Sequence, residues 1–315
     1  MHDMTHAVVV GYDGSASAGA AVDWAVAEAA RRGSTLALVH STDITGVLVG
    51  PENVSSWLVV PYQDAVARRV LAVPHEDAVA RRVVEEGMAR ARKTTTEVVS
   101  VTEVGGAARV LTRASETADL LVVGSRGHGS FTGALLGSVA FAVTARASCP
   151  VVVARGDTSR APGPGWPVVA AVDGSLEADA ATDHAASVAA ATDAALHLVS
   201  VWQMRAAESW ATTYVADVDP DRSLLEAPRA DAEALLEQSR QRVARTYPGL
   251  RVHTRAVEGI TSRALAEASR GAGLLVMGSR GRSGLAGLLL GSTSRALVHL
   301  AECPVAVVKV RRGVA

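Results

Sequence analysis

Short apolar runs alternate with longer amphipathic segments along most of the chain. Runs of Val, Leu and Ala that are bounded by Gly, Ser, Asp or Thr are typical of buried strands. Segments with apolar residues at helical spacing lie between them, and the first of these ends at Gly33, a predicted helix stop. Over the first 155 residues this pattern predicts strands at 7–11, 35–41, 97–104, 119–125 and 149–155, and helices at 17–33, 75–93, 107–118 and 138–147.

The same order of elements recurs in the rest of the chain. Strands are predicted there at 167–173, 195–201, 251–258, 273–279 and 303–310. Continuous apolar strands that alternate with helices favour a parallel sheet with helices on both faces. We therefore expect an α/β protein of two tandem doubly wound domains, each with a five-stranded, mostly parallel sheet.

Two sequence motifs occur once in each copy. "VVVGYDGS" begins at Val8 and returns as "VVAAVDGS" at Val168, an offset of 160 residues. "GSRGHGSFTGALLGS" begins at Gly124 and returns as "GSRGRSGLAGLLLGS" at Gly278, an offset of 154 residues. A repeat of this length indicates two copies of one structural unit.

A segment rich in Gly, Pro and Ser separates the two copies. Residues 156–166 are the predicted linker, so the domains are 1–155, called half 1, and 167–312, called half 2. Half 1 is longer around residues 46–62. A short direct repeat, "DAVARRV", begins at Asp64 and again at Asp77, and we interpret it as a local duplication within a helix.

Both motifs follow predicted parallel strands, so they lie at the carboxyl edge of a sheet, where such folds bind ligands. Glycines let the backbone approach a ligand closely, and a helix that begins at Gly137 offers N–H groups and partial positive charge to an anion. Ser138 is the predicted N-cap of that helix. Cationic side chains in the two loops are Arg126, His128, Arg280 and Arg282. The pattern predicts one phosphate site in each half.

Composition excludes several other classes. The chain is 49% hydrophobic, 20% charged and carries a formal net charge of −1, with no basic run that would mark a nucleic-acid partner. No apolar run is long enough for a membrane span, and the N-terminus lacks the pattern of a signal peptide, so we expect a cytoplasmic protein. Lys93 and Lys309 are the only lysines, and neither follows a glycine as a P-loop requires.

Isolated reactive side chains show no catalytic or metal-binding pattern. Cys149 and Cys303 each precede a proline at the same point of the repeat, and we expect both to be buried. The histidines lack the spacing of a zinc site, and no G-x-S-x-G motif occurs. We expect His40, at the end of a strand, to have a structural role.

The spacing G-x2-G-x9-G-S, together with a strand-end Asp-Gly-Ser, resembles the universal stress protein family in its tandem, ATP-binding form. The resemblance covers nearly the whole chain and implies a Rossmann-like fold of the adenine nucleotide alpha hydrolase-like type. It implies a stress-response regulator that binds one ATP per domain and signals through conformation or assembly, without being an enzyme. Mg²⁺ would be held mainly by phosphate and water oxygens.

The resemblance also implies an assembly. The strands "CPVVVAR" and "CPVAVVKV" would pair within one chain to give a pseudo-dimer, which removes two exposed sheet edges. A homodimer of such chains and a protein partner of unknown identity are further implied, whereas neither nucleic acid nor a membrane is an expected partner.

Each residue of the implied nucleotide sites is carried over by its position in the motifs. Strand-end aspartates would lie beside adenosine, the ends of the second and fourth strands beside adenine, and the glycines and helix starts beside ribose and phosphates. In half 1 the set is Gly11, Tyr12, Asp13, Ser41, Val123, Gly124, Arg126, Gly127, Gly137, Ser138 and Val139. In half 2 it is Ala171, Val172, Asp173, Val201, Met277, Gly278, Arg280, Gly281, Gly291, Ser292 and Thr293.

Two residues of half 1 depart from the family pattern. Ser41 is polar where an aliphatic residue is usual, and Tyr12 is bulky, so both predict a weaker first site. An alternative function is a slow ATPase or an adenylate-processing enzyme on the same fold, although the S-G-G-x-D-S pyrophosphate loop is absent. A second alternative is an interaction module with vestigial crevices, which the intact glycine motifs disfavour.

Overall fold

The structure is a computed structural model that describes residues 4–42, 74–92, 97–127, 136–203, 223–281 and 290–310. Half 1 contains β1 (Val8–Gly11), α1 (Ala16–Arg32), β2 (Leu36–Thr42), α3 (Pro74–Ala91), β3 (Val98–Val104), α4 (Ala107–Ala114), β4 (Leu120–Gly124), α5 (Ser138–Arg146) and β5 (Val151–Ala154). Half 2 contains β6 (Val168–Ala171), α6 (Leu176–Thr192), β7 (Leu196–Trp202), α8 (Ser223–Thr246), β8 (Val252–Glu258), α9 (Thr261–Ala268), β9 (Leu274–Gly278), α10 (Ser292–Leu300) and β10 (Val305–Val308).

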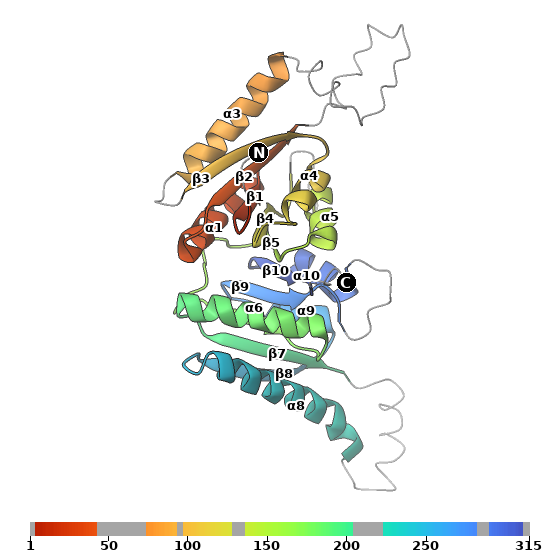
Figure 1. The fold of residues 1–315 in the computed structure, drawn as a ribbon. Coiled ribbons are helices and arrows are strands. Elements are labelled where there is room, and N and C mark those ends of the chain that lie inside the picture. Colours follow the sequence, from red (N-terminus) through yellow and green to blue (C-terminus); the bar gives the residue numbers. More distant parts are fainter. Residues whose placement is uncertain are drawn as a thin grey trace, which may run out of the picture.

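All these strands belong to one sheet with the order β3-β2-β1-β4-β5-β10-β9-β6-β7-β8 (Figure 1). Each neighbouring pair is parallel except the central one, where β5 and β10 run antiparallel with Val151 opposite Val307. The predicted pairing of the two last strands is therefore confirmed. Because the half-sheets run in opposite directions, their carboxyl ends lie at opposite edges of the sheet, and so do the two predicted sites.

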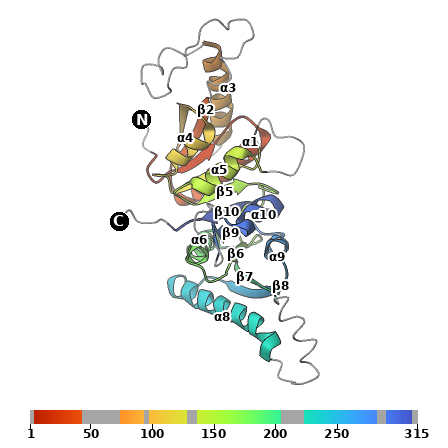
Figure 2. The same cartoon turned by 90° about the vertical axis from the view of Figure 1, so that its right-hand side faces the viewer.

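Helices cover both faces of the sheet, as Figure 2 shows. The alternation of side chains along each strand divides the core into two layers: Val8 and Val10 face one layer with α1, α3, α6 and α8, whereas Val9 faces the other with α4, α5, α9 and α10. The predicted fold class, two doubly wound α/β units with helices on both faces, is confirmed.

Local signals explain where the helices end. Gly33 takes the left-handed conformation (φ 63°) at the predicted stop of α1. Helix α4 ends at Ala114, four residues before its predicted end. The buried Ser115 follows the last helical residue, where its hydroxyl donates to the Thr112 carbonyl and accepts the Ser148 N–H at 2.9 Å.

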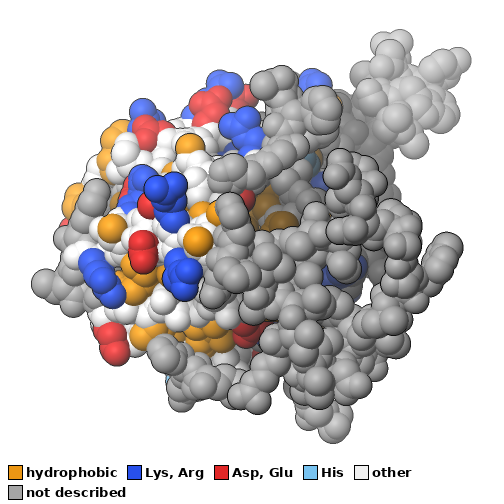
Figure 3. Space-filling view, turned by 90° about the horizontal axis from the view of Figure 1, so that it is seen from above, with side chains coloured by type: hydrophobic (Ala, Val, Ile, Leu, Met, Phe, Trp, Pro, Cys, Tyr) orange, Lys and Arg blue, Asp and Glu red, His pale blue; other side chains and the backbone are white. Residues whose placement is uncertain are grey.

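The described helices and the charged surface bear on the expectations from composition. Within the described ranges, no helix combines the length and apolarity that a bilayer span requires. On the face shown in Figure 3, acidic and basic side chains are interspersed among the coloured residues. The region 46–62 and the copy of the direct repeat at Asp64 lie outside the described residues.

Candidate functional site

The Asp-Gly-Ser turn after β1 has one structural task for each residue. Gly14 has φ 86°, a conformation that favours glycine. The Asp13 carboxylate accepts the Ser15 N–H at 3.0 Å, and the Ser15 hydroxyl accepts the Ala18 N–H at 3.1 Å as the N-cap of α1. The turn therefore fixes the Asp13 carboxylate at the carboxyl edge of the sheet.

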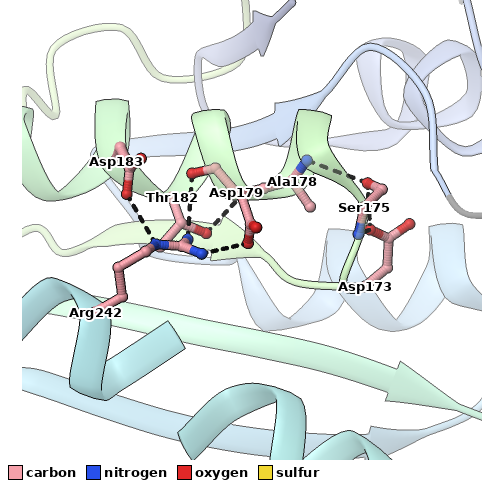
Figure 4. Close-up of polar contacts among 7 residues, drawn as sticks. All are labelled: Asp173, Ser175, Ala178, Asp179, Thr182, Asp183 and Arg242. Carbon is pink, nitrogen blue, oxygen red and sulfur yellow. Dashed lines mark hydrogen bonds and ion pairs between the residues drawn. The ribbon is translucent and has the colours of Figure 1, made fainter. Parts of the chain in front are cut away.

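Half 2 repeats this turn closely (Figure 4). Gly174 has φ 80°, and Asp173 accepts both the N–H of Ser175 at 3.0 Å and its hydroxyl at 2.6 Å. Ser175 in turn caps α6 by accepting the Ala178 N–H at 3.2 Å. Both strand-end aspartates are thus held by the same local chemistry.

The glycine loop passes directly beside this aspartate. A Cβ atom on Gly127 would lie 2.6 Å from Asp13 Oδ2, and one on Gly281 would lie even nearer Asp173 Oδ2. The glycine loop of half 1 also contacts the first turn of α1, since the Arg126 N–H donates to the Ser17 hydroxyl at 3.2 Å. The two loops therefore meet at the carboxyl edge of the sheet, and only glycine allows the backbone to lie this close to the carboxylate.

The first glycine of each loop permits a different close approach. A Cβ atom on Gly124 would lie 2.7 Å from the carbonyl carbon of Ser17, and one on Gly278 would lie 2.8 Å from that of Glu177. These neighbours are backbone atoms in the first turn of α1 or α6, which cannot move aside as a flexible side chain can. These glycines therefore set the distance between the strand end and the helix.

The second helix of the site begins one residue earlier than a serine cap would place it. Gly137 is the N-cap, with φ −63° and ψ 149°, and Ser138 is already helical, so the prediction of Ser138 as N-cap is wrong. Gly291 and Ser292 repeat this arrangement. No side chain caps either helix, which leaves first-turn N–H groups, including that of Val139, directed at the position an anion would take.

Each helix start is tied to its loop by one backbone bond. The Gly137 N–H donates to the Ser125 carbonyl at 2.9 Å, and the Gly291 N–H donates to the Ser279 carbonyl at 2.8 Å. Half 2 adds the buried Ser294, whose hydroxyl donates to the Gly278 carbonyl at 2.8 Å. The glycine loop and the helix start therefore form one connected unit in each half.

Apolar residues predicted to line the adenine position lie in one layer of the core. Val123 and Met277 are buried there, and Val201 is partly buried.

The remaining predicted site residues fall into three groups. Ala171 and Val139 pack against the same layer, Val172 and Tyr12 belong to the layer on the opposite face of the sheet, and Ser41 and Thr293 are half-buried at a strand end and a helix start. A Cβ on Gly11 would press on Leu111.

Tyr12 packs in the core layer opposite Val123 and Met277, so its bulk does not lie among the apolar residues assigned to adenine. A weaker first site stays a prediction. Tyr12 is only 8% exposed, and its ring packs on α3, where a Cβ on Gly87 would lie 2.7 Å from Tyr12 Cδ1. Burial raises the pKa of the Tyr12 hydroxyl, and the nearby Glu86 adds to the shift. His40 Nδ1 donates to the Tyr12 carbonyl at 2.8 Å, a structural role of the kind expected.

The residue that follows the first helical position in α1 and α6 was not among the predicted site residues. Ser17 in half 1 contacts the Arg126 backbone, whereas Glu177 in half 2 accepts a hydrogen bond from the Arg280 side chain at 2.8 Å. Both positions carry the offset of 160 residues seen in the first motif. A residue-by-residue comparison of the two sequence copies is the signal that reveals this difference.

Several side chains reach across the β5–β10 pairing to a backbone group of the other half. His299 Nδ1 accepts the N–H of Leu136, the residue before the α5 cap, at 3.1 Å. Lys309 Nζ donates to the Ala147 carbonyl at 3.0 Å, and Arg155 donates to the Val298 carbonyl. Burial lowers the pKa of Lys309 to about 8. Half 2 therefore supports α5 of the half-1 site, and half 1 supports α10 of the half-2 site.

Metal-ligating and thiol side chains do not gather at either crevice. Among the residues that the structure describes, no group of three or more His, Cys, Asp or Glu side chains is placed to hold a metal ion. Both cysteines are buried as expected, and burial raises the pKa of the Cys303 thiol to about 11. His128 and Arg282, which were expected to add positive charge, lie outside the described residues.

Comparison with known proteins gives one consistent result. A sequence model of the universal stress protein family matches residues 4–155 and 167–309. A universal stress protein of Mycolicibacterium smegmatis is 32% identical over 313 residues, which cover 97% of this chain and 98% of that protein. A universal stress protein of Mycobacterium tuberculosis is 34% identical over 306 residues, which cover 96% of each chain.

Solved structures resemble the fold over the same length. The crystal structure of a universal stress protein from Archaeoglobus fulgidus is similar with a TM-score of 0.66 and 21% identity, over 98% of this chain and 100% of that one. At this identity the likeness concerns the fold alone.

Proposed function

We propose that this chain, which belongs to the universal stress protein family, is a stress-response regulator that binds one ATP in each half. The observation that carries the proposal is the paired arrangement of a glycine loop against a fixed aspartate and an uncapped helix start. This arrangement occurs at both carboxyl edges of the sheet, with nearly the same distances.

The residues present fit an adenine nucleotide. Gly127 and Gly281 lack side chains, so their loops lie directly against Asp13 and Asp173, which we assign to the sugar. The first-turn N–H groups of α5 and α10 suit the phosphates. Val123 and Met277 supply apolar side chains for the base. Arg126 adds positive charge beside the glycines of half 1, whereas Arg280 of half 2 is paired with Glu177. Bound Mg²⁺ would neutralise part of the phosphate charge and would be held mainly by phosphate and water oxygens.

We propose binding and signalling rather than turnover as the role of the site. A hydrolase needs a base or a water-orienting group near the terminal phosphate. Asp13 and Asp173 accept hydrogen bonds from the serines that follow them, and we assign them to the adenosine end of the nucleotide. Slow phosphate release on mixing with Mg·ATP would favour the alternative of a slow ATPase.

Signalling would pass through assembly or a partner surface. We propose that ATP occupancy changes the pairing of whole chains into a homodimer, or the contact with a protein partner, in the cytoplasm. Sedimentation velocity with and without saturating Mg·ATP tests this step. Identical sedimentation and identical partner binding in both conditions would reject it.

Binding itself is tested by the nucleotide that the protein carries from the cell. The purified chain is denatured and the released small molecules are identified by mass spectrometry. We expect ATP. Absence of any adenine nucleotide, together with no saturable binding of Mg·ATP to the purified protein, would reject the proposed function.

A further inference from the structure

We infer that the two sites differ in their preference for phosphate charge, and that Glu177 makes half 2 discriminate against the triphosphate relative to adenosine. The inference rests on the proposed function, since it concerns the same two crevices. It assigns to Glu177 a specificity role that the glycine motif does not contain.

Glu177 lies where the helix, the strand end and the glycine loop meet. Its Cβ would be 2.8 Å from a Cβ on Gly278, and its carboxylate pairs with the Arg280 guanidinium at 2.8 Å. The side chains of Arg280 and Glu177 are only 27% and 18% exposed. The pair therefore neutralises the loop arginine and turns it toward the start of α6.

Half 1 has the same backbone but a different charge. Ser17 occupies the position of Glu177, and its hydroxyl accepts the Arg126 backbone N–H at 3.2 Å and lies 3.4 Å from the Ser125 hydroxyl. Arg126 is exposed. Half 1 therefore has an exposed arginine and a neutral serine where half 2 has an ion pair.

The other charged groups around the two loops match one another. Each half has a strand-end aspartate, Asp13 or Asp173, and a basic residue after its last strand, Arg155 or Lys309. Arg155 acts electrostatically on the loop arginine of half 1, and Lys309 and the loop arginine of half 2 repel each other in the same way. The first turn of α6 carries two carboxylates, Glu177 and Asp179, where α1 carries none. Asp179 pairs with Arg242 of α8, so Glu177 is the one of the two that contacts the glycine loop.

A carboxylate beside a site for three phosphates opposes binding in proportion to the charge of the ligand. Two like charges several ångströms apart in a partly buried site cost enough to change an affinity by about tenfold, and salt weakens the effect. Adenosine carries no charge, so its affinity is nearly independent of Glu177. We therefore expect the ratio of ATP affinity to adenosine affinity to be lower in half 2 than in half 1.

Reciprocal substitutions test the role, each with one site silenced. Gly127→Leu silences half 1 and Gly281→Leu silences half 2, because each side chain would displace the adjacent aspartate carboxylate. Glu177→Ser and Glu177→Gln are made in the first background, and Ser17→Glu in the second. Mg·ATP and adenosine are titrated separately by calorimetry at low and at high salt, and circular dichroism verifies the fold of each variant.

We expect both Glu177 variants to strengthen ATP binding by about tenfold at low salt and by less at high salt, with adenosine affinity changed less than about threefold. Ser17→Glu should weaken ATP binding by a similar factor. Weaker ATP binding after Glu177→Gln, or equal ATP-to-adenosine ratios in the two wild-type halves, would overturn the inference. A gain with Ser but none with Gln would also overturn it, because the effect would then be steric. Absence of adenosine and ATP binding in both backgrounds would instead reject the proposed function.

Discussion

Half 1 and half 2 agree closely in the Asp-Gly-Ser turns and the glycine loops and differ in the side chains around them. Gly14 and Gly174 have similar positive φ angles, and the first glycines of the two loops press on helix backbone in the same way. The helix residue that these loop glycines contact, by contrast, is Ser17 in half 1 and Glu177 in half 2. The shared features define what the crevice requires, and the differences show how two copies of one crevice acquire different charge.

The pair of helices that flanks each site shows the same division. In half 1, Arg90 of α3 binds Asp23 of α1 at 2.6 Å. In half 2, Arg242 of α8 binds Asp183 at 3.2 Å and also Asp179 at 2.5 Å, as drawn in Figure 4. Asp179 stands where half 1 has a glycine, so half 2 holds its helices together with one more carboxylate.

Removing the space beside one aspartate should have the largest effect. Gly127→Leu and Gly281→Leu should each abolish one ATP site, a loss of more than about a hundredfold in affinity. The added side chain would collide with the Asp13 or Asp173 carboxylate beside the glycine. Calorimetric stoichiometry should fall by one site per chain in each variant. Gly165→Leu in the linker is the matched control, since a Cβ there meets nothing within 4 Å. Unchanged stoichiometry in both loop variants would contradict the assignment of the glycine loops to the ATP sites.

Acid should destabilise the fold through a residue that only half 2 has. Burial lowers the pKa of His184 on α6 from 6.5 to about 4, with repulsion from nearby Arg32 of α1 as a second cause, while Glu28 opposes the shift and Arg31 adds to it. The unfolded chain therefore binds the proton first as the pH falls. Stability present above pH 6.5 should be lost between pH 6.5 and 4, by about 1–2 kcal/mol because the His184 residue as a whole is only half-buried.

Urea denaturation at pH 7 and at about pH 4.5 measures this loss. Half 1 has Trp24 at the equivalent position, so His184→Phe is the matched variant, and it should show a smaller decrease in the free energy of unfolding. An equal decrease in the variant and the wild type would rule out His184 as the source.

Loss of the ion pairs between α6 and α8, or between α1 and α3, should lower the free energy of unfolding by a smaller amount. Arg242→Ala leaves two carboxylates of α6 without their cation, so it should lower the free energy of unfolding by about 1 kcal/mol, whereas Arg90→Ala should cost about 0.5 kcal/mol. Both pairs are partly exposed, which keeps the values small. Asp179→Gly, which restores the residue of half 1, should bring the effect of Arg242→Ala close to that of Arg90→Ala. A larger loss for Arg90→Ala would reverse the comparison.

The smallest expected effect concerns support across the β5–β10 pairing. His299→Ala removes the acceptor for the Leu136 N–H next to the α5 cap, so it should weaken ATP binding in half 1 by about threefold, the value of one hydrogen bond. Ala145 takes the equivalent position in half 1 and offers no side-chain acceptor. Half 2 should therefore bind ATP as before, and a loss confined to half 2 would refute the proposed support.

The fold was predictable from the sequence because its signals are local. Buried parallel strands appear as continuous apolar runs, Gly33 marks a helix end, and the two copies of the motif reveal the duplication. The pairing of β5 with β10 followed from the resemblance, since two equal edges cover one another.

Side-chain direction and contacts between distant elements were not predictable in this way. Tyr12 follows a strand that points at the crevice, yet its ring turns to the opposite layer, where Gly87 leaves room for it. Ser138 is of a residue type that is common at N-caps, but the preceding Gly137 adopts the extended conformation that an N-cap requires. The pair of Glu177 and Arg280 joins residues 103 positions apart, and only the tertiary fold brings them together.

The central claim is that the glycines of both halves make room for an adenine nucleotide. Calorimetric titration of the nucleotide-free wild-type chain with Mg·ATP tests it most directly. We expect saturation near two ATP per chain, with one site weaker than the other. Absence of saturable binding would contradict the claim and would leave the two crevices as parts of a duplicated interaction scaffold.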